Sequence, residues 1–316
     1  MAAQVLAPLL AARAATLAYY SPYFCLAQAL PGLPHALFGE QRGRIFGQQD
    51  SEEILSSGPE SSAVQWLMER LSWDSAYFGT PVYRLFTGLF GPDVTNEELR
   101  VAARALQDKL AERGSFYAYG LAPAQDVRLL QALTGAGWRL VETRLTYYRD
   151  NLTALDWPRF SVRTAQLHDK ERVAVIASAN PNPYDRFHAD PWFGPARADA
   201  FLARYAAAAV AGTMADAVLL PAEPGLPIDS FLAISDLQAD AALLGVRLSR
   251  IMLTAVGPLN RGWHVKLVAE TLHRARAHGH SAVLMTTQAT NTAVCRTAEK
   301  LGFKLGSVSH VLSCWA

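Results

Sequence analysis

The stretch 251–302 constrains the fold of this chain more than any other part of the sequence. It begins with an apolar run, IMLTAV, which the turn residues GPLNRG separate from an amphipathic segment over 261–278. A second apolar run, AVLMTTQ, and the segment NTAVCRTAEKLGF follow. The hydrophobic period changes from that of a strand to that of a helix, and then repeats. The pattern therefore predicts strand, turn, helix, strand and helix in that order, which is typical of α/β proteins.

Two segments far apart in the sequence share the same kind of helix-to-strand junction. Residues 133–140 are LTGAGWRL, and residues 298–305 are AEKLGFKL. Each combines a helix end, a glycine stop, an aromatic and a basic residue, and the start of a long strand. Such a pair at the ends of two comparable units indicates a duplicated domain. We therefore predict tandem α/β (α+β) units built around a mixed sheet.

The expected elements follow from periodicity and from cap residues. In the first unit we expect strands at 80–88, 115–120 and 138–149, a helix capped at Thr95 that runs to Arg113, and a helix at 123–134. In the second unit we expect strands at 160–163, 216–220, 229–236, 241–256, 281–287 and 303–315, and helices at 166–178, 197–211, 261–278 and 291–301. Residues 180–196 are rich in proline and aromatic residues and are expected to form a loop.

Three parts are expected along the chain: an apolar arm and linker over 1–62, a truncated domain over 63–150 and a complete domain over 160–316. Residues 14–39 contain no charged side chain, but three prolines interrupt them, which argues against a membrane span. No Lys or Arg precedes Arg13, so the basic region of a secretory signal is missing. The arm is expected to pack on the body or on a second subunit, which would give a homodimer. Residues 40–62 are polar with Gly and Ser breaks, which predicts an irregular linker.

Composition narrows the classes of function. The chain has 316 residues, of which 51% are hydrophobic and 18% charged, and this excludes global disorder. Lys and Arg number 29 against 28 Asp and Glu, so a nucleic-acid partner is not expected. Three dispersed cysteines, Cys25, Cys295 and Cys314, form neither a disulfide framework nor a zinc motif, which favours a cytoplasmic location. His278 and His280 are interpreted as a solvated turn, and no metal is expected.

The order of elements in 251–302 resembles the core of the GCN5-related N-acetyltransferase superfamily. There, a splayed strand leads into a loop of the form Arg/Gln-x-x-Gly-x-Gly/Ala, whose backbone N–H groups hold the coenzyme A pyrophosphate at a helix N-terminus. A later Asn opens the helix along the pantetheine arm. The resemblance implies acetyl-CoA or another acyl-CoA as co-substrate, with the oxyanion on a backbone N–H near Thr254–Val256. The implied coenzyme-binding residues are Thr254, Ala255, Val256, Pro258, Leu259, Asn260, Arg261, Gly262, Trp263, His264, Val265 and Asn291.

Other motifs resemble one subfamily, the TDP-4-amino-4,6-dideoxy-galactose (TDP-fucosamine) N-acetyltransferases. These motifs are 72–79 (SWDSAYFG), 186–191 (RFHADP), Thr287-Gln288 and 291–293 (NTA). That group combines a truncated first half with a complete second half, and the resemblance covers roughly residues 66–316. It implies an amino-sugar nucleotide of polysaccharide biosynthesis as the small-molecule amine substrate, with Arg186 and His188 as substrate-binding residues.

Three positions depart from the superfamily pattern. His264 stands where the loop has Gly, and Lys266 stands where it has Gly or Ala. Ala298 stands where the superfamily commonly has a Tyr that protonates the leaving thiolate. Cys295 and His264 are the residues that we consider first as replacement catalytic acids, followed by Thr297 and His310.

Three functions remain open from the sequence. The first is an acyl-CoA-dependent N-acyltransferase in which the substrate amine attacks the thioester directly. The second is a catalytically impaired pseudo-acetyltransferase that serves as a ligand-binding or assembly protein. The third keeps the fold but uses a different acyl donor or a carrier-protein thioester.

Overall fold

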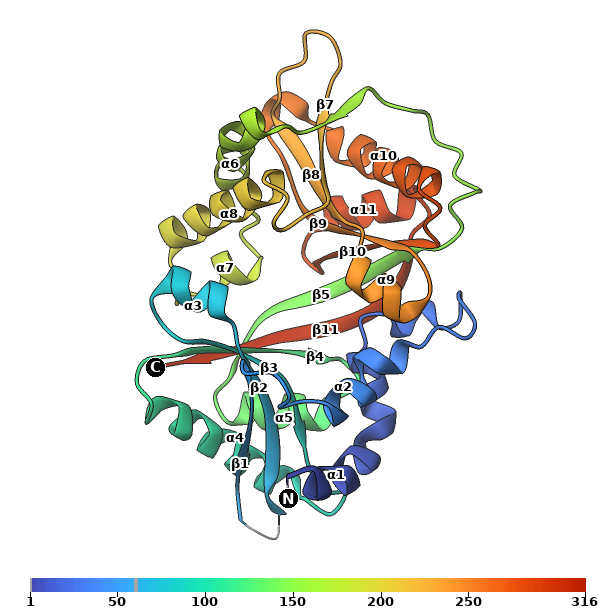
Figure 1. The fold of residues 1–316 in the computed structure, drawn as a ribbon. Coiled ribbons are helices and arrows are strands. Elements are labelled where there is room, and N and C mark those ends of the chain that lie inside the picture. The colour runs from blue at the N-terminus through green and yellow to red at the C-terminus, as the bar shows by residue number, and fades with distance from the viewer. Residues whose placement is uncertain (1, 60–61) are drawn as a thin grey trace. The chain divides into compact units, whose positions relative to one another are not determined.

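A computed structural model describes residues 2–59 and 62–316, which divide into two compact units. Unit 1 comprises the described residues up to Ala27, together with Pro34–Thr143 and Val308–Ala316. Unit 2 comprises Gln28–Leu33 and Arg144–Ser307. Both units combine helices with strands, as Figure 1 shows, and this agrees with the predicted α/β class.

Unit 1 contains strands in the order β1-β2-β3-β4-β11, of which β11 contributes its residues from Val308 onward. Their bounds are β1 Glu52–Ser57, β2 Val64–Arg70, β3 Val82–Leu89, β4 Tyr117–Pro123 and β11 Lys304–Trp315. β3 and β4 are parallel, and the other neighbours are antiparallel. The helices are α1 Ala2–Leu17, α2 Glu40–Arg44, α3 Ser72–Phe78, α4 Asn96–Ala111 and α5 Val127–Gly135, with short 3-10 turns at Ala18–Tyr20, Phe24–Leu26 and His35–Phe38.

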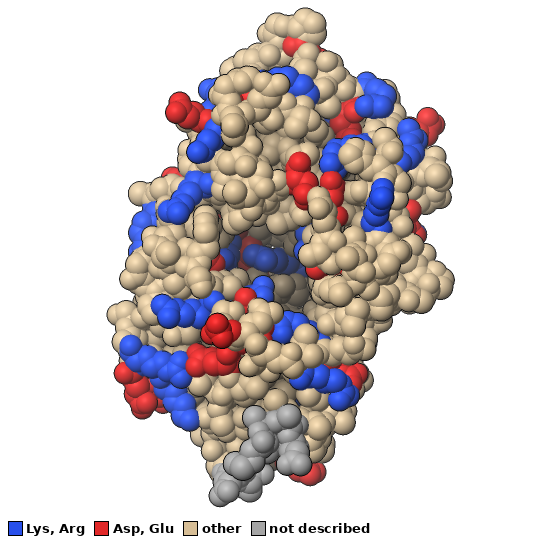
Figure 2. All heavy atoms as spheres, in the orientation of Figure 1, with Lys and Arg blue, Asp and Glu red and all other residues tan. Residues whose placement is uncertain are grey.

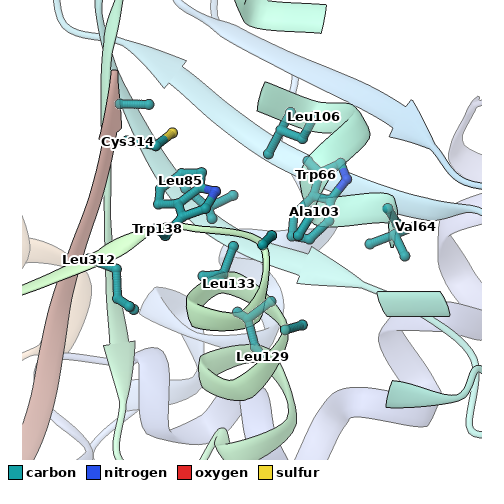
Figure 3. Packing of buried hydrophobic residues seen from close by; sticks show 14 of the residues in the cluster. Val64, Trp66, Leu85, Ala103, Leu106, Leu129, Leu133, Trp138, Leu312 and Cys314 are labelled. Atoms are coloured by element: carbon teal, nitrogen blue, oxygen red, sulfur yellow. The ribbon is translucent and has the colours of Figure 1, made fainter. Parts of the chain in front are cut away.

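Alternate residues of β2 supply two separate cores in unit 1. Trp66 and Met68 lie in a cluster that α4 and α5 cover, as Figure 3 shows for Trp66 among the labelled side chains. Leu67 points to the opposite face and packs with side chains of α1. α4 begins at the predicted cap, because Thr95 accepts from the Glu98 backbone N–H while the Glu98 carboxylate accepts from Thr95.

The N-terminal segment is part of unit 1. Leu6, Leu10 and Leu17 of α1 are buried against the face of β2 and β3 opposite to α4. Arg13 forms a buried ion pair with Asp126, and the Tyr20 hydroxyl donates to the same carboxylate at 2.6 Å. Burial and the nearby Asp126 raise the pKa of Tyr20 well above its usual range. The segment 40–62 differs from the expected linker, because α2 and the edge strand β1 lie within it.

Unit 2 contains strands in the order β5-β10-β9-β8-β7-β6, of which β5 contributes its residues from Arg144 onward. Their bounds are β5 Arg139–Arg149, β6 Val162–Thr164, β7 Ala217–Pro221, β8 Ser230–Ser235, β9 Leu248–Val256 and β10 Ala282–Gln288. β9 and β10 are parallel, and the other neighbours are antiparallel. The helices are α6 Lys170–Ala179, α7 Arg186–Ala189, α8 Pro195–Val210, α9 Gln238–Leu244, α10 Trp263–Ala277 and α11 Thr292–Lys300, with 3-10 turns at Leu167–Asp169 and Pro258–Asn260.

Helices cover both faces of the unit 2 strands. Leu232 and Ile234 of β8 pack in the cluster of α10 and α11, whereas Phe231 and Ala233 pack in the cluster of α6 and α8. This alternation is what a strand buried on both faces requires. The strand expected over 241–256 was too long, since α9 occupies its first part and ends at Gly245, whose φ is +69°.

Positive and negative side chains are interspersed over the face shown in Figure 2. This distribution fits the near-zero net charge. Among the described residues, no helix combines the length and apolarity needed to cross a bilayer.

Candidate functional site

The parallel strands β9 and β10 separate toward their C-terminal ends. Their register pairs 248–251 with 282–285, and no pair follows Ile251 and Met285. A bulge at Met252 also interrupts the pairing of β9 with β8. The separated ends border a cavity of about 160 Å³ and an adjoining one of about 390 Å³. Both are lined by residues of unit 2 alone, from β9, the loop 180–185 and the first turns of α10 and α11, and the smaller one also by β10, α6 and α8.

The open edge of β9 presents backbone N–H groups to these cavities. The Gly257 N–H donates to the Asp229 carbonyl at 2.6 Å, directly beyond the β8–β9 register. Antiparallel pairs alternate between hydrogen-bonded and non-bonded positions, so Ala255 is bonded to β8 whereas Thr254 and Val256 direct their N–H groups to the other edge. Because the pairing with β10 has ended at Ile251, neither N–H group has a partner strand on that edge.

Asp229 holds the loop between β9 and α10 in place. Its carboxylate accepts from the Leu259 N–H at 3.0 Å, and a Cβ at Gly257 would overlap this carboxylate. The buried Asn260 side chain accepts from the Asp229 N–H and the Ser230 hydroxyl and donates to the Pro227 carbonyl. Asn260 therefore shapes the loop with its side chain and is not free to bind a ligand through it.

α10 begins at Gly262, whose φ is +86°. A Cβ at this position would meet no atom within 4 Å, so the surface beside Gly262 is open. The first N–H groups of a helix have no acceptor within it, and they carry the positive end of the helix dipole. The exposed Arg261 lies next to this helix end. Lys266 points elsewhere, since its Nζ lies 3.1 Å from Glu223 and 4.4 Å from the Trp263 ring centroid.

His264 lines both cavities from the first turn of α10. Its Nδ1 lies 3.0 Å from the Thr297 hydroxyl, which itself donates to the Ala293 carbonyl at 3.1 Å. Because the Thr297 hydroxyl already donates its proton, its oxygen accepts from the His264 Nδ1–H. The ring proton therefore lies on Nδ1, and Nε2 carries the lone pair. Burial lowers the pKa of His264 to about 4, so the ring is neutral at pH 7. Nε2 is buried and has no hydrogen-bond partner among the described residues.

Asp185 lines the smaller cavity from the loop before α7. Its carboxylate caps α7 through the N–H groups of Phe187 and His188. The His188 ring bridges two carboxylates, with Nδ1 at 2.9 Å from Asp185 and Nε2 at 3.0 Å from Asp199. Burial lowers the pKa of His188, but the hydrogen bonds to Asp199 and Asp185 outweigh it and raise the pKa above its usual value.

The structure brings only some of the predicted site residues to the cavities. Arg186 and His188 are engaged beside them, because the Arg186 guanidinium lies 4.4 Å from the Phe187 ring centroid and His188 holds Asp185. The sequence pattern did not single out Asp185 as a cavity residue, although it directly precedes the motif RFHADP. The predicted residues that line a cavity are Thr254, Ala255, Val256, His264 and Asn291.

The residues considered as replacement acids lie in different surroundings. Cys295 packs against Tyr147 of β5, where burial and a hydrogen bond to Cys295 raise the pKa of Tyr147 to about 12. His310 hydrogen-bonds Thr143 within unit 1. Ala298 is fully buried, and its side chain packs in the core of unit 2.

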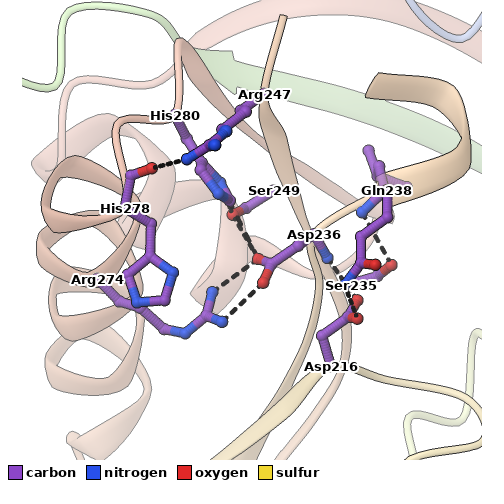
Figure 4. A network of polar contacts seen from close by, with 10 residues as sticks. Asp216, Ser235, Asp236, Gln238, Arg247, Ser249, Arg274, His278 and His280 are labelled. Atoms are coloured by element: carbon purple, nitrogen blue, oxygen red, sulfur yellow. Dashed lines mark hydrogen bonds and ion pairs between the residues drawn. The ribbon is translucent and has the colours of Figure 1, made fainter. Parts of the chain in front are cut away.

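A polar network lies at the other end of β9 and α10. Figure 4 shows Asp236 accepting from both guanidinium nitrogens of Arg274, each at 2.7 Å, and from Ser249 at 3.1 Å. Asp236, His278 and His280 offer potential ligand atoms within 4.8 Å of one another. The bidentate Arg274 already neutralises the carboxylate, which makes this group a structural link between β8, β9 and α10.

Comparisons with known proteins identify the fold. No protein-family model matches the sequence, and no curated protein matches it. A solved GCN5-related N-acetyltransferase from Sphaerobacter thermophilus is 13% identical, with a TM-score of 0.53 over 97% of this chain and 91% of that one. A functionally unknown protein from Staphylococcus epidermidis also has a TM-score of 0.53, with 9% identity over 83% of this chain and 94% of that one.

A third solved structure contains the GCN5-related glucosamine N-acetyltransferase region of a fungal multi-domain GH3 β-N-acetylglucosaminidase. It is 12% identical with a TM-score of 0.53 and covers 80% of this chain and 31% of that one. At these identities the similarity shows the fold alone. The chain has the fold of GCN5-related N-acetyltransferases, which confirms the predicted fold class of tandem α/β units with a splayed strand pair.

Proposed function

We propose that this protein is an N-acyltransferase that binds an acyl-CoA in unit 2 and transfers the acyl group to the amine of a small molecule. The observation that carries the proposal is the separation of β9 and β10 over a cavity that the N-terminus of α10 borders. The acetyltransferase fold supports it. A cytoplasmic location and the division into an arm, a truncated domain and a complete domain remain predictions from the sequence.

The residues at the start of α10, at the start of α11 and at the end of β9 suit an acyl-CoA. The open surface at Gly262 and the free N–H groups that follow it would hold the pyrophosphate, with Arg261 adding positive charge. Asn291, which caps α11 by accepting from the Val294 N–H, borders the larger cavity with the start of that helix and would line the pantetheine arm. The Thr254 and Val256 N–H groups would receive the thioester oxygen.

Transfer needs few additional groups. The amine nitrogen attacks the thioester carbon, negative charge develops on the oxygen, and the backbone N–H groups of β9 stabilise it. The C–S bond then breaks and the sulfur leaves with the electron pair. A thiolate is a better leaving group than an alkoxide, so the absence of a Tyr at position 298 weakens catalysis less than the loss of a nucleophile would.

A second function, a pseudo-acetyltransferase that binds a ligand without transferring an acyl group, is favoured by one observation. Residue 298 is an alanine, which has no hydroxyl group to donate a proton. This alternative predicts coenzyme binding without turnover.

A thermal-shift titration with acetyl-CoA tests the proposed function. At about 100 times Kd, a ligand that binds only the folded state stabilises it by about 2.7 kcal/mol. We expect a saturable rise in Tm with acetyl-CoA, and no rise with an equal concentration of UMP, which lacks the adenine and pantetheine groups of the coenzyme. No shift with acetyl-, propionyl- or malonyl-CoA would contradict the proposal.

A further inference from the structure

We infer that the acyl acceptor is a small amine that enters as a cation without phosphate groups, that Asp185 binds its ammonium group, and that His264 Nε2 takes the proton that the nitrogen loses on attack. This inference rests on the proposed function and specifies the acceptor of the same site. It assigns roles to two side chains that line one cavity from the loop 180–185 and from α10.

The charge of the cavity walls favours a cationic acceptor without phosphate groups. Among the described residues that line the two cavities, none is Lys or Arg, and Asp185 is the one carboxylate. The remaining lining is apolar or neutral, including Leu202, Leu253 and Met285. A phosphorylated acceptor would bring negative charge toward Asp185 with no cation to compensate, which is unfavourable in a partly enclosed site. An ammonium group finds a fixed partner there.

The groups around Asp185 fix the orientation of its carboxylate. Two backbone N–H groups and the His188 ring hold its carboxylate, and Asp199 holds the far side of that ring. The carboxylates of Asp185 and Asp199 both face the His188 ring and raise its pKa, and Asp185 is held in a fixed orientation on the cavity wall. His188 and Asp199 act on the substrate only through Asp185, so they are positioning residues.

The tautomer of His264 leaves one ring nitrogen able to accept a proton. Its Nδ1–H is committed to Thr297, so the only free position on the ring is the Nε2 lone pair. His264 lines the cavity, and the buried, unpartnered Nε2 of its neutral imidazole can accept a proton. Because the pKa of His264 is about 4, the imidazolium once formed is a strong acid and readily gives the proton up.

The proton and electron balance is closed. The bound ammonium first releases one proton to solvent and becomes a free amine. Its lone pair forms the N–C bond as the C–S bond breaks, and sulfur keeps the electron pair of that bond. The second proton passes from nitrogen to His264 Nε2 and then to the thiolate sulfur. The products are an amide and the coenzyme A thiol, and no oxidant or further reactant is needed.

Matched acceptors test the inference. Acetyl transfer is followed as thiol release with the full chain and acetyl-CoA, using glucosamine against glucosamine 6-phosphate and ethanolamine against phosphoethanolamine. Within each pair the amine is the same and only the phosphate differs. We expect at least a tenfold higher kcat/KM for the unphosphorylated member of any pair that is acetylated. A preference for the phosphorylated member, or for a TDP-amino sugar over both pairs, would overturn the inference.

Variants distinguish recognition from folding. Asp185→Asn keeps a side chain that caps helices well, and we expect it to lower kcat/KM for the amine at least tenfold while the Kd of acetyl-CoA stays within twofold. Asp150→Asn makes the same change at a unit 2 carboxylate that pairs with Lys304 away from the cavities, and it serves as the matched control. Equal effects of the two variants would overturn the role of Asp185. Binding of acetyl-CoA without transfer to any unphosphorylated amine overturns the inference but not the coenzyme site, whereas absence of acetyl-CoA binding overturns the proposed function itself.

Discussion

His264 Nδ1 and Thr297 Oγ1 lie 3.0 Å apart and connect the first turn of α10 to the middle of α11. This hydrogen bond does two things at once. It ties together two helices that border the cavity, and it determines which nitrogen of the His264 ring carries the proton.

Replacing Thr297 by Val should therefore lower activity more than it lowers stability. The methyl group fills the same space but cannot accept from Nδ1–H, so the ring loses its fixed tautomer and one buried hydrogen bond. We expect kcat to fall about tenfold or more, with a loss of about 1 kcal/mol in the free energy of unfolding. Thr297→Ser keeps the hydroxyl and should restore kcat. Equal kcat in the Val and Ser variants would show that the tautomer does not matter.

The stability of the protein should depend on pH through His264. Burial lowers its folded-state pKa to about 4, while in the unfolded chain the pKa returns to 6.5. Below pH 6.5 the unfolded chain takes up a proton that the folded protein does not, so stability falls as the pH drops from 6.5 toward 4. Each pKa unit corresponds to about 1.36 kcal/mol, which gives a loss of about 2 kcal/mol between pH 7 and pH 5.

Urea unfolding of the wild type and of His264→Asn at both pH values isolates this contribution. The Asn amide can keep the hydrogen bond to Thr297 but does not titrate. The wild type should lose about 2 kcal/mol more than the variant on going from pH 7 to pH 5. Parallel losses in the two proteins would mean that His264 is not buried in its neutral form.

The Arg13–Asp126 pair should be essential to the stability of unit 1. Both side chains are about 95% buried, and the Arg13 guanidinium also lies 4.2 Å from the Phe90 ring centroid. Arg13→Met keeps the length of the side chain but leaves the Asp126 charge buried without its cation. We expect a loss of about 3–5 kcal/mol in the free energy of unfolding.

A second substitution separates the cost of the unpaired Asp126 charge from the cost of the lost Arg13 packing. Asp126→Asn in the Arg13→Met background removes the charge and should recover about 1 kcal/mol or more. If Arg13→Met leaves the urea midpoint unchanged, the N-terminal segment is not anchored as described.

Local sequence rules predicted most of the elements. Thr95 and Glu98 mark the start of α4 because their capping box needs only residues three apart. The strand β1 was missed because 52–57 (EEILSS) is polar, and its pairing with β2 is what makes it a strand. The helix α9 was merged into a strand because AALL suits either state, and Gly245 was the overlooked stop.

The sequence predicted less of the site than of the fold. The motif pointed to His264 and Asn291, which do line the cavities. Thr297 lies 33 residues from its partner His264, and Asp199 lies 11 residues from its partner His188, so spacing rules reach neither contact. Arg186 looked like a ligand group in the sequence, and only the packing shows its guanidinium over the ring of Phe187.

Calorimetric titration of acetyl-CoA into the full chain and two glycine variants tests the central claim most directly. Gly262 and Gly279 both have positive φ, +86° and +70°, and a Cβ at either would meet nothing within 4 Å. Alanine therefore introduces similar backbone strain, of about 1 kcal/mol, at both positions. Only Gly262 begins α10 at the proposed phosphate site, whereas Gly279 follows the end of that helix.

We expect one acetyl-CoA per chain, a Kd at least tenfold weaker in Gly262→Ala, and an unchanged Kd in Gly279→Ala. A single site is expected because Arg13 and Tyr20 occupy unit 1 where α5 begins. No binding by the wild type, two sites per chain, or equal Kd values in the two variants would contradict it.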